Sequence, residues 1–313
     1  MPLLSLEDLS YPAVAALDRA RTVLLLSVSP LEEHGPHLPL NVDLLAAEHF
    51  AGALAERFLA DHEDWNVVRM PPLPVGCGGF DAPGTVEVRA STVRNLVYDF
   101  GASFARHGFR YLFICNGHGA VTQLVELEDA ARSVERKYGM KMVSLSSSII
   151  PEILGGAYWE RIERFLGRPL SQEERSQLAV DTHAGLLETS VMLELRPEQV
   201  GEYQHLQPYT PSRFTRFIPN HAMRIGGSGY VGYPAQATRE LGSAAVKAFV
   251  EVAYAKMLEA MDNPARERRS ALAKVPVLRA GFRQRTGLVM ALAAAVAFGY
   301  FIARRRQDSY PDT

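Results

Sequence analysis

Two short apolar runs, each followed directly by polar and glycine residues, constrain the fold most strongly. Val23–Val28 (VLLLSV) precedes a polar loop at 29–41, and Tyr111–Cys115 (YLFIC) ends in Asn116-Gly117-His118-Gly119. Continuous apolar runs of this length are typical of strands that are buried on both faces of a parallel sheet. In open parallel sheets, active sites lie at the carboxyl ends of the strands. The pattern therefore predicts a functional site where these two strands end.

The segments around these runs predict that strands alternate with helices. Three segments are expected to be helices, at Asp43–Phe58, Ser91–His107 and Val121–Tyr138. Two further short strands are expected at Val67–Met70 and Met142–Leu145. This alternation is typical of an α/β fold, in which a mainly parallel sheet is covered by helices on both faces.

The composition excludes several classes of protein. The 313 residues are 47% hydrophobic and 22% charged, which excludes wholesale disorder. The net charge of -2 argues against a dedicated nucleic-acid-binding protein. Two cysteines, Cys77 and Cys115, are too few for a disulfide scaffold or a Cys-rich zinc module. Both are interpreted as small buried thiols rather than as nucleophiles.

The charge is unevenly distributed, and its basic part surrounds an apolar segment. From Asn263 onward, ten basic residues oppose three acidic ones, which gives +7 and leaves -9 for residues 1–262. Residues 286–303 (TGLVMALAAAVAFGYFIA) contain no charge and no proline. A helix of that length spans about 27 Å, close to the thickness of a bilayer core. A buried helix of the globular domain is the alternative, but the flanking arginines and the pair Tyr300-Phe301 favour a membrane anchor.

These features predict four parts of the chain and a location. The parts are a globular domain at 1–262, a basic linker at 263–285, a transmembrane helix at 286–303 and a short tail at 304–313. The first ten residues, MPLLSLEDLS, contain acids and no basic region, unlike a signal peptide. More basic residues precede the apolar segment than follow it, so we expect a cytoplasmic domain anchored to the membrane by its C-terminal helix.

The first polar cluster predicts a metal site. Glu32, Glu33, His34, His37 and Asp43 lie within twelve residues that follow a strand end. Imidazole nitrogens and carboxylate oxygens are the ligands of Zn²⁺, Mn²⁺ and Fe²⁺, and one carboxylate can bridge two ions in a binuclear hydrolase. A solvated loop with incidental charges is the alternative. The position at a strand end and the glycine and prolines in the loop favour metal binding.

Two further clusters add residues that could carry chemistry. His118 lies between two glycines, which permit a close approach of the backbone. His183 and Glu188 lie in Asp181–Ser190 (DTHAGLLETS). Five residues along one helix would place their side chains about 140° apart, so we expect His183 to precede the helix that carries Glu188. His183 is a candidate general acid or base, whereas Glu188 could also serve as an acid that complements the helix dipole.

Four segments together resemble the creatininase (creatinine amidohydrolase) family. Residues 32–43 resemble its E-x-H-G-x-H-L-P-x-x-x-D signature, and residues 116–119 resemble its N-G-H-G. Residues 183–190 resemble H-A-G-x-x-E-T-S, and residues 229–238 resemble G-x-x-G-x-P-x-x-A-T. The resemblance covers about residues 1–260. It implies a three-layer α/β fold, a divalent metal centre, hydrolysis of non-peptide amide C–N bonds, and a hexameric assembly.

The resemblance also implies roles for individual residues. The implied metal ligands are Glu32, His34, Asp43 and His118. Asp43 takes the bridging position between two ions, and His183 takes the place of the histidine that transfers a proton. Creatininase has a glutamate ligand two residues after the N-G-H histidine, where this chain has Ala120. Glu188 is the best candidate to complete the second metal site, and the departure at Ala120 argues against creatinine itself as substrate.

We therefore expect a metal-dependent hydrolase with two Zn²⁺, Mn²⁺ or Fe²⁺ ions, which cleaves a cyclic or formyl amide of a small molecule. One alternative is a peptidase that trims a redox-cofactor precursor peptide. Another is a membrane-tethered binding protein without activity, although the first and third motifs are intact. A phosphoesterase is expected to have more carboxylates and a basic phosphate loop, and the clusters here are almost free of Lys and Arg. No nucleic-acid partner is expected.

Overall fold

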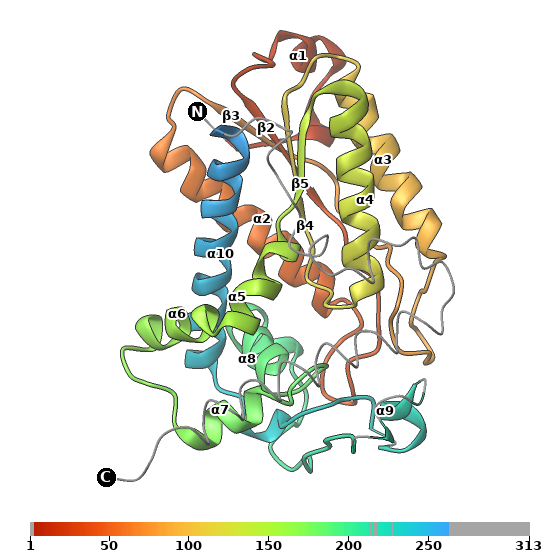
Figure 1. The fold of residues 1–313 in the computed structure, drawn as a ribbon, viewed down its shortest axis with the longest axis vertical. Coiled ribbons are helices and arrows are strands. Elements are labelled where there is room, and N and C mark those ends of the chain that lie inside the picture. The colour runs from red at the N-terminus through yellow and green to blue at the C-terminus, as the bar shows by residue number, and fades with distance from the viewer. Residues whose placement is uncertain (1–2, 213, 216–217, 219, 227, 263–313) are drawn as a thin grey trace.

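The computed structural model describes residues 3–262, except 213, 216–217, 219 and 227. Their helices and strands form three layers, with a sheet between two sets of helices (Figure 1). The predicted linker, transmembrane helix and tail lie outside the described residues. None of the helices that the structure describes combines the length and the apolar content needed to cross a bilayer.

The described residues form a five-stranded parallel sheet in the order β1-β3-β2-β4-β5. The strands are β1 (Leu3–Ser5), β2 (Thr22–Ser27), β3 (Asn66–Arg69), β4 (Tyr111–Cys115) and β5 (Lys141–Ser144). The register places Leu24 of β2 opposite Val68 of β3 and Leu112 of β4. The sequence pattern predicted β2 to β5 to within one residue. It did not indicate β1, because three residues at a sheet edge are too short to show a period.

Helices cover both faces of the sheet because β2 is apolar on both sides. Val23 and Leu25 pack into one core cluster, and Leu24 and Leu26 pack into the other. The first cluster is covered by α2 (Val42–Asp61), α6 (Ala157–Leu166), α8 (Leu186–Leu195) and α10 (Arg239–Asp262). The second is covered by α1 (Tyr11–Ala16), α3 (Ala90–Ala105) and α4 (Val121–Tyr138). The expected α/β fold is therefore confirmed for the described residues.

The remaining elements are short. The other α-helices are α5 (Ile149–Gly155), α7 (Gln172–Leu178) and α9 (His221–Arg224). Short 3-10 turns occur at Leu6–Asp8, Ser146–Ser148, Pro197–Gln199 and Pro234–Gln236. Figure 1 places α7 and α9 at the lower end of the molecule, to which the carboxyl end of β4 also points. The polar segments that follow β2 and β4 thus meet the second half of the chain at one edge of the sheet.

Candidate metal centre

The loop after β2 holds Glu32 and His34 in fixed orientations. The backbone NH of Glu32 donates to the Leu40 carbonyl at 2.9 Å, which closes the loop. Glu32 Oε1 accepts a hydrogen bond from the Phe80 backbone NH at 2.7 Å. His34 Nδ1 lies 3.0 Å from the Glu32 carbonyl. Because a carbonyl oxygen only accepts, Nδ1 carries the hydrogen of this contact, which leaves Nε2 on the side of the ring that faces Asp43. Asp43, the second residue of α2, is buried beside this nitrogen.

The turn after β4 brings His118 to the start of α2. The Asn116 side-chain amide donates to the His118 carbonyl at 2.6 Å, and its oxygen accepts from Gln123 Nε2 at 2.9 Å. A Cβ on Gly117 would lie 2.3 Å from the Asp43 carbonyl oxygen. The glycine of this motif therefore permits a backbone contact that any other residue would block. The local sequence thus explains why His118 reaches Asp43.

A turn before α8 brings His183 and Glu188 to the same side. Ala184 has a left-handed backbone with φ of 47°, and α8 begins at Leu186. Glu188 Oε2 accepts a hydrogen bond from the Ala184 backbone NH at 2.6 Å. A Cβ on Gly185 would lie 1.9 Å from Asp181 Oδ1, so this position requires glycine. As predicted, His183 precedes the helix that carries Glu188.

The side chains from these three segments converge on Asp43. Asp43 Oδ2 lies 3.0 Å from His118 Nδ1, and Asp43 Oδ1 lies 3.4 Å from His34 Nε2. His118 Nδ1 is also 3.0 Å from Glu32 Oε2, and His34 Nε2 is also 3.6 Å from Glu188 Oε2. Two candidate ligand groups result, Glu32–Asp43–His118 and His34–Asp43–Glu188, each with ligand atoms within 4.8 Å of one another. The two groups share Asp43.

His183 lies beside these groups. A further set of ligand atoms within 4.8 Å joins His183 to Glu32 and His34. His183 Nε2 is 2.8 Å from the Glu33 carbonyl and 3.3 Å from Glu33 Oε1, so this nitrogen carries the hydrogen that it donates. The ring centroids of His34 and Phe80 lie 4.5 Å and 4.7 Å from that of His183. These contacts hold the imidazole at the edge of the centre.

The chemistry of the buried atoms fits a cation. Glu32 Oε2, His34 Nε2 and Asp43 Oδ2 are buried without a hydrogen-bond partner, which is costly for polar atoms. Burial by itself lowers the pKa of His118, but Asp43 and Glu32 outweigh it and raise the pKa to about 10. Burial and the opposing charge of Asp43 act in the same way on His34, whose pKa is also raised to about 10. The site therefore favours positive charge, and its donor set suits a divalent ion.

The structure adds contacts to the site that the sequence did not predict. Glu33 contacts His183, and its only signal in the sequence was its place beside Glu32 and His34. The Phe80 backbone binds Glu32 and its ring packs on His183, and no local pattern marks it. The Cys77 and Cys115 thiols lie outside these ligand groups, and burial raises the pKa of both to about 12, which keeps them protonated.

The sequence of this chain is similar to that of known hydrolases. A family model described as creatinine amidohydrolase matches residues 7–257. The creatinine amidohydrolase of Pseudomonas putida is 29% identical over 253 residues, which cover 73% of this chain and 86% of that protein. The mycofactocin precursor peptide peptidase of Mycolicibacterium smegmatis is 30% identical over 180 residues. That match covers 57% of this chain and 60% of the peptidase, less than two thirds of its length.

Solved structures share the fold over most of the chain. A glutamate-to-glutamine mutant of creatininase complexed with creatine has a TM-score of 0.62 and 25% identity, and the match covers 83% of this chain and 99% of that one. A structure described as creatininase Mn also has a TM-score of 0.62, at 24% identity, over 84% of this chain and all of that one. The three-layer arrangement of the described residues is thus shared with these enzymes.

Proposed function

This chain belongs to the creatininase family, and we propose on that premise that it is a metal-dependent hydrolase that cleaves an amide C–N bond. One observation carries the proposal: buried carboxylate and imidazole atoms from three distant segments converge on Asp43 without satisfying one another's hydrogen bonds. Removing charged groups from water in this way is costly unless a cation compensates them. A structural role alone would not require two such groups around one carboxylate.

We assign two sets of ligands to two divalent ions. Glu32 and His118 would hold one ion, His34 and Glu188 would hold the other, and Asp43 would contribute to both. Ala120 has no ligand atom, and Glu188 supplies a carboxylate to the His34 side. Imidazole and carboxylate ligands suit Zn²⁺, Mn²⁺ and Fe²⁺.

The residues around the ligands support hydrolysis of an amide. Divalent ions bound here would lower the pKa of water and polarise the carbonyl group of the substrate. The Glu33 carbonyl accepts the hydrogen of His183 Nε2 and so fixes the ring orientation. We assign to His183 the delivery of a proton to the leaving nitrogen, a contribution that is typically about 10²–10⁴-fold in rate. The Phe80 ring packs on this imidazole and limits the access of water to it.

We propose a non-peptide amide, cyclic or formyl, as the first substrate class. The similarity to the mycofactocin precursor peptide peptidase favours a second class, in which the chain trims a short peptide. The two classes differ in product, because formamide hydrolysis releases formate and peptide cleavage releases a new amino terminus. Analysis of the products released from a mixed set of compounds therefore separates the two classes.

The test is elemental analysis of the purified full chain, followed by a screen of cyclic amides that includes creatinine, of formamides and of short peptides. We expect about two divalent ions per chain. Asp43→Asn should lose metal and activity together. Glu56→Gln, an exposed position on the same helix, is the matched control and should keep both. Full metal content in Asp43→Asn would show that the ligand assignment is wrong.

A further inference from the structure

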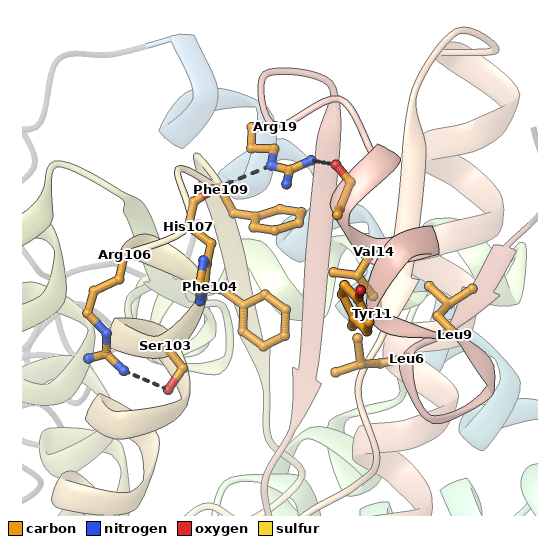
Figure 2. A pocket seen from close by; sticks show the side chains of 11 residues that line it. Leu6, Leu9, Tyr11, Val14, Arg19, Ser103, Phe104, Arg106, His107 and Phe109 are labelled. Carbon is orange, nitrogen blue, oxygen red and sulfur yellow. Dashed lines mark hydrogen bonds between the residues drawn. The ribbon is translucent and has the colours of Figure 1, made fainter.

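A cavity lies at the end of the sheet opposite to the metal centre. Its volume is about 670 Å³. Leu6, Leu9 and Val14 form one wall, and Phe104 and Phe109 form the other (Figure 2). Phe109 lies two residues before β4, at the amino end of the strand, whereas the metal centre lies at the carboxyl end. The cavity therefore shares no residue with the centre.

One rim of the cavity is an exposed apolar helix. Ser10–Leu17, which contains α1, has no charged residue. The Tyr11 side chain lines the cavity and is 87% exposed, and Ala13, Ala15 and Ala16 are also exposed. Soluble surfaces seldom leave such a run uncovered, whereas apolar helices with an aromatic residue are common at bilayer interfaces. The outer side of the helix therefore suits an apolar surrounding.

Two arginines, Arg19 and Arg106, lie among the polar groups at the cavity. Arg19 donates to the backbone carbonyls of Ala15, Leu17 and His107, and its guanidinium lies 5.0 Å from the centre of the Phe109 ring. Arg106 is exposed and donates to the Ser103 hydroxyl at 3.4 Å. Within the described part of the chain neither arginine forms an ion pair, and no acidic side chain lines the cavity. The cavity thus combines apolar walls with two arginines and has no acidic residue in its lining, which suits an amphiphilic anion.

The chain leaves the described domain at this same end. α10 ends at Asp262, and Tyr254 in its second half donates to Asp61, the final residue of α2, at 2.7 Å. After α2 the chain enters β3 at its amino end, and the cavity lies at this same end of the strands. Figure 1 shows α1 and the last turns of α10 at one end of the molecule. From there the sequence continues into the basic segment 263–285.

The positive charge at the cavity distinguishes two possible partners, the chain's own apolar segment and an anionic lipid bilayer. The chain's own apolar segment, 286–303, is flanked by arginines on both sides, which the arginines of the cavity would repel. An anionic bilayer attracts both the cavity and the basic segment 263–285. We propose that this end of the domain faces an anionic bilayer and that the cavity takes up a lipid, with its head group beside Arg19 and its apolar part between Leu9 and Phe104, while Arg106 faces the bilayer surface. This placement depends on the predicted anchor and leaves the metal centre facing away from the membrane.

The test places a fluorescent label on α1 of the full chain. Ala13→Cys is an exposed site that keeps the cavity lining, and burial keeps the native thiols unreactive. The labelled chain is reconstituted in phosphatidylcholine vesicles with or without phosphatidylglycerol, which contain lipids with a nitroxide on the head group. Ser176→Cys on α7, exposed at the opposite end, is the matched control.

We expect quenching at position 13 to exceed that at position 176, and to increase with phosphatidylglycerol. Arg106→Gln should weaken the phosphatidylglycerol-dependent contact about fivefold, since one basic residue near an anionic surface contributes about 1 kcal/mol. Equal quenching at the two positions, or no dependence on phosphatidylglycerol, would overturn the proposal. A chain that does not associate with vesicles, or a label that responds only to dispersed oleate, would also overturn it. The metal content of each variant shows that it is folded.

Discussion

Asp43 is the residue on which the candidate centre depends. Its two oxygens face different histidines, at 3.0 Å from His118 and 3.4 Å from His34. Burial alone would raise its pKa, but the two histidines outweigh this effect and hold the pKa far below its usual range. Asp43 is therefore ionised at neutral pH, which a bridging ligand requires.

His183 gives the first prediction at this scale. His183→Ala removes the proposed proton donor and leaves the carboxylate and imidazole ligands around Asp43 in place. Turnover should fall about 10²–10⁴-fold while metal content stays at the level of the parent protein. Steady-state rates and elemental analysis of the same preparation check both parts. Loss of metal from this variant would instead identify His183 as a ligand.

Glu188 gives the second prediction at the scale of single residues. Its carboxylate faces His34 Nε2 at 3.6 Å, on one side of Asp43 only. Glu188→Gln should therefore lower the metal content from about two ions per chain to about one. Glu194→Gln, on the same helix and paired with Arg239 at the surface, is the control and should keep the parent stoichiometry. An unchanged metal content in Glu188→Gln would show that Glu188 is not a ligand and would favour the alternative, an acid that complements the dipole at the start of α8.

At the scale of elements, the close contact of α8 with α10 supports the segment that carries Glu188. A Cβ on Gly242 of α10 would lie 1.8 Å from the Ser190 carbonyl oxygen of α8. The backbones of α8 and α10 are therefore so close at this position that a side chain would not fit between them. On the same face of the sheet, Phe50 of α2 stacks on Phe249 of α10 with ring centroids 3.7 Å apart. α10 therefore fixes α8 relative to α2, and with it Glu188 relative to Asp43.

This packing leads to the third prediction. Gly242→Ala forces α8 and α10 apart, and overpacking of this kind costs about 1–3 kcal/mol of unfolding free energy. Denaturant unfolding of the metal-loaded protein measures the loss. Gly155→Ala, at the end of α5, places its Cβ in open space and serves as the control, with an effect within about 1 kcal/mol. Equal stability of the two variants would show that the helices can separate without cost.

At the scale of the whole molecule, the charge of the centre couples folding to pH. In the metal-free protein the pKa of His34 and of His118 is raised from 6.5 to about 10. A histidine of this kind stabilises the fold fully below the unfolded value of 6.5 and loses that effect as the pH rises to its folded value. Metal binding needs both imidazoles deprotonated, so metal affinity should change in the opposite direction.

The fourth prediction follows from this coupling. The unfolding free energy of the chelator-treated protein should fall between pH 6.5 and about 10, while the stabilisation by added metal should grow over the same range. Denaturant titrations at several pH values, with chelator and with metal, measure both trends. Metal-free stability that rises with pH in this range would contradict the charge assignment of the centre.

The fifth prediction concerns the predicted anchor. Ala294→Arg places a charge in the middle of the apolar segment 286–303, which costs about 2.5–3.5 kcal/mol at a bilayer centre. We expect this variant to move from the membrane fraction to the soluble fraction, as should a chain that lacks residues 281–313. Ala294→Leu keeps the segment apolar and should stay with the membrane. A parent chain found only in the soluble fraction would contradict the predicted anchor.

The hexamer implied by the resemblance stays a separate prediction.

The sequence by itself determined four of the five described strands, β2 to β5, and the helices α2, α3 and α4. β4 and α4 lie where the apolar runs and helical spacing predicted, because the period of side-chain burial is a local property. The polar residues at the ends of β2 and β4 were also expected to meet, since the carboxyl ends of parallel strands share one edge of the sheet. The assignment of Glu32, His34, Asp43 and His118 as ligands came from the motif that resembles the family, and it stays a prediction.

Only the tertiary structure decided how the second half of the chain completes the site. Glu188 reaches Asp43, and His183 reaches Glu32 and His34, because Ala184 adopts a left-handed turn and His183 bridges to Val231, far along the chain. Phe80 and Glu33 join the site through contacts that no local pattern encodes. The cavity beside α1 likewise depends on packing between segments that are about ninety residues apart. Long-range contacts depend on turns and register that the burial period of a single segment does not contain.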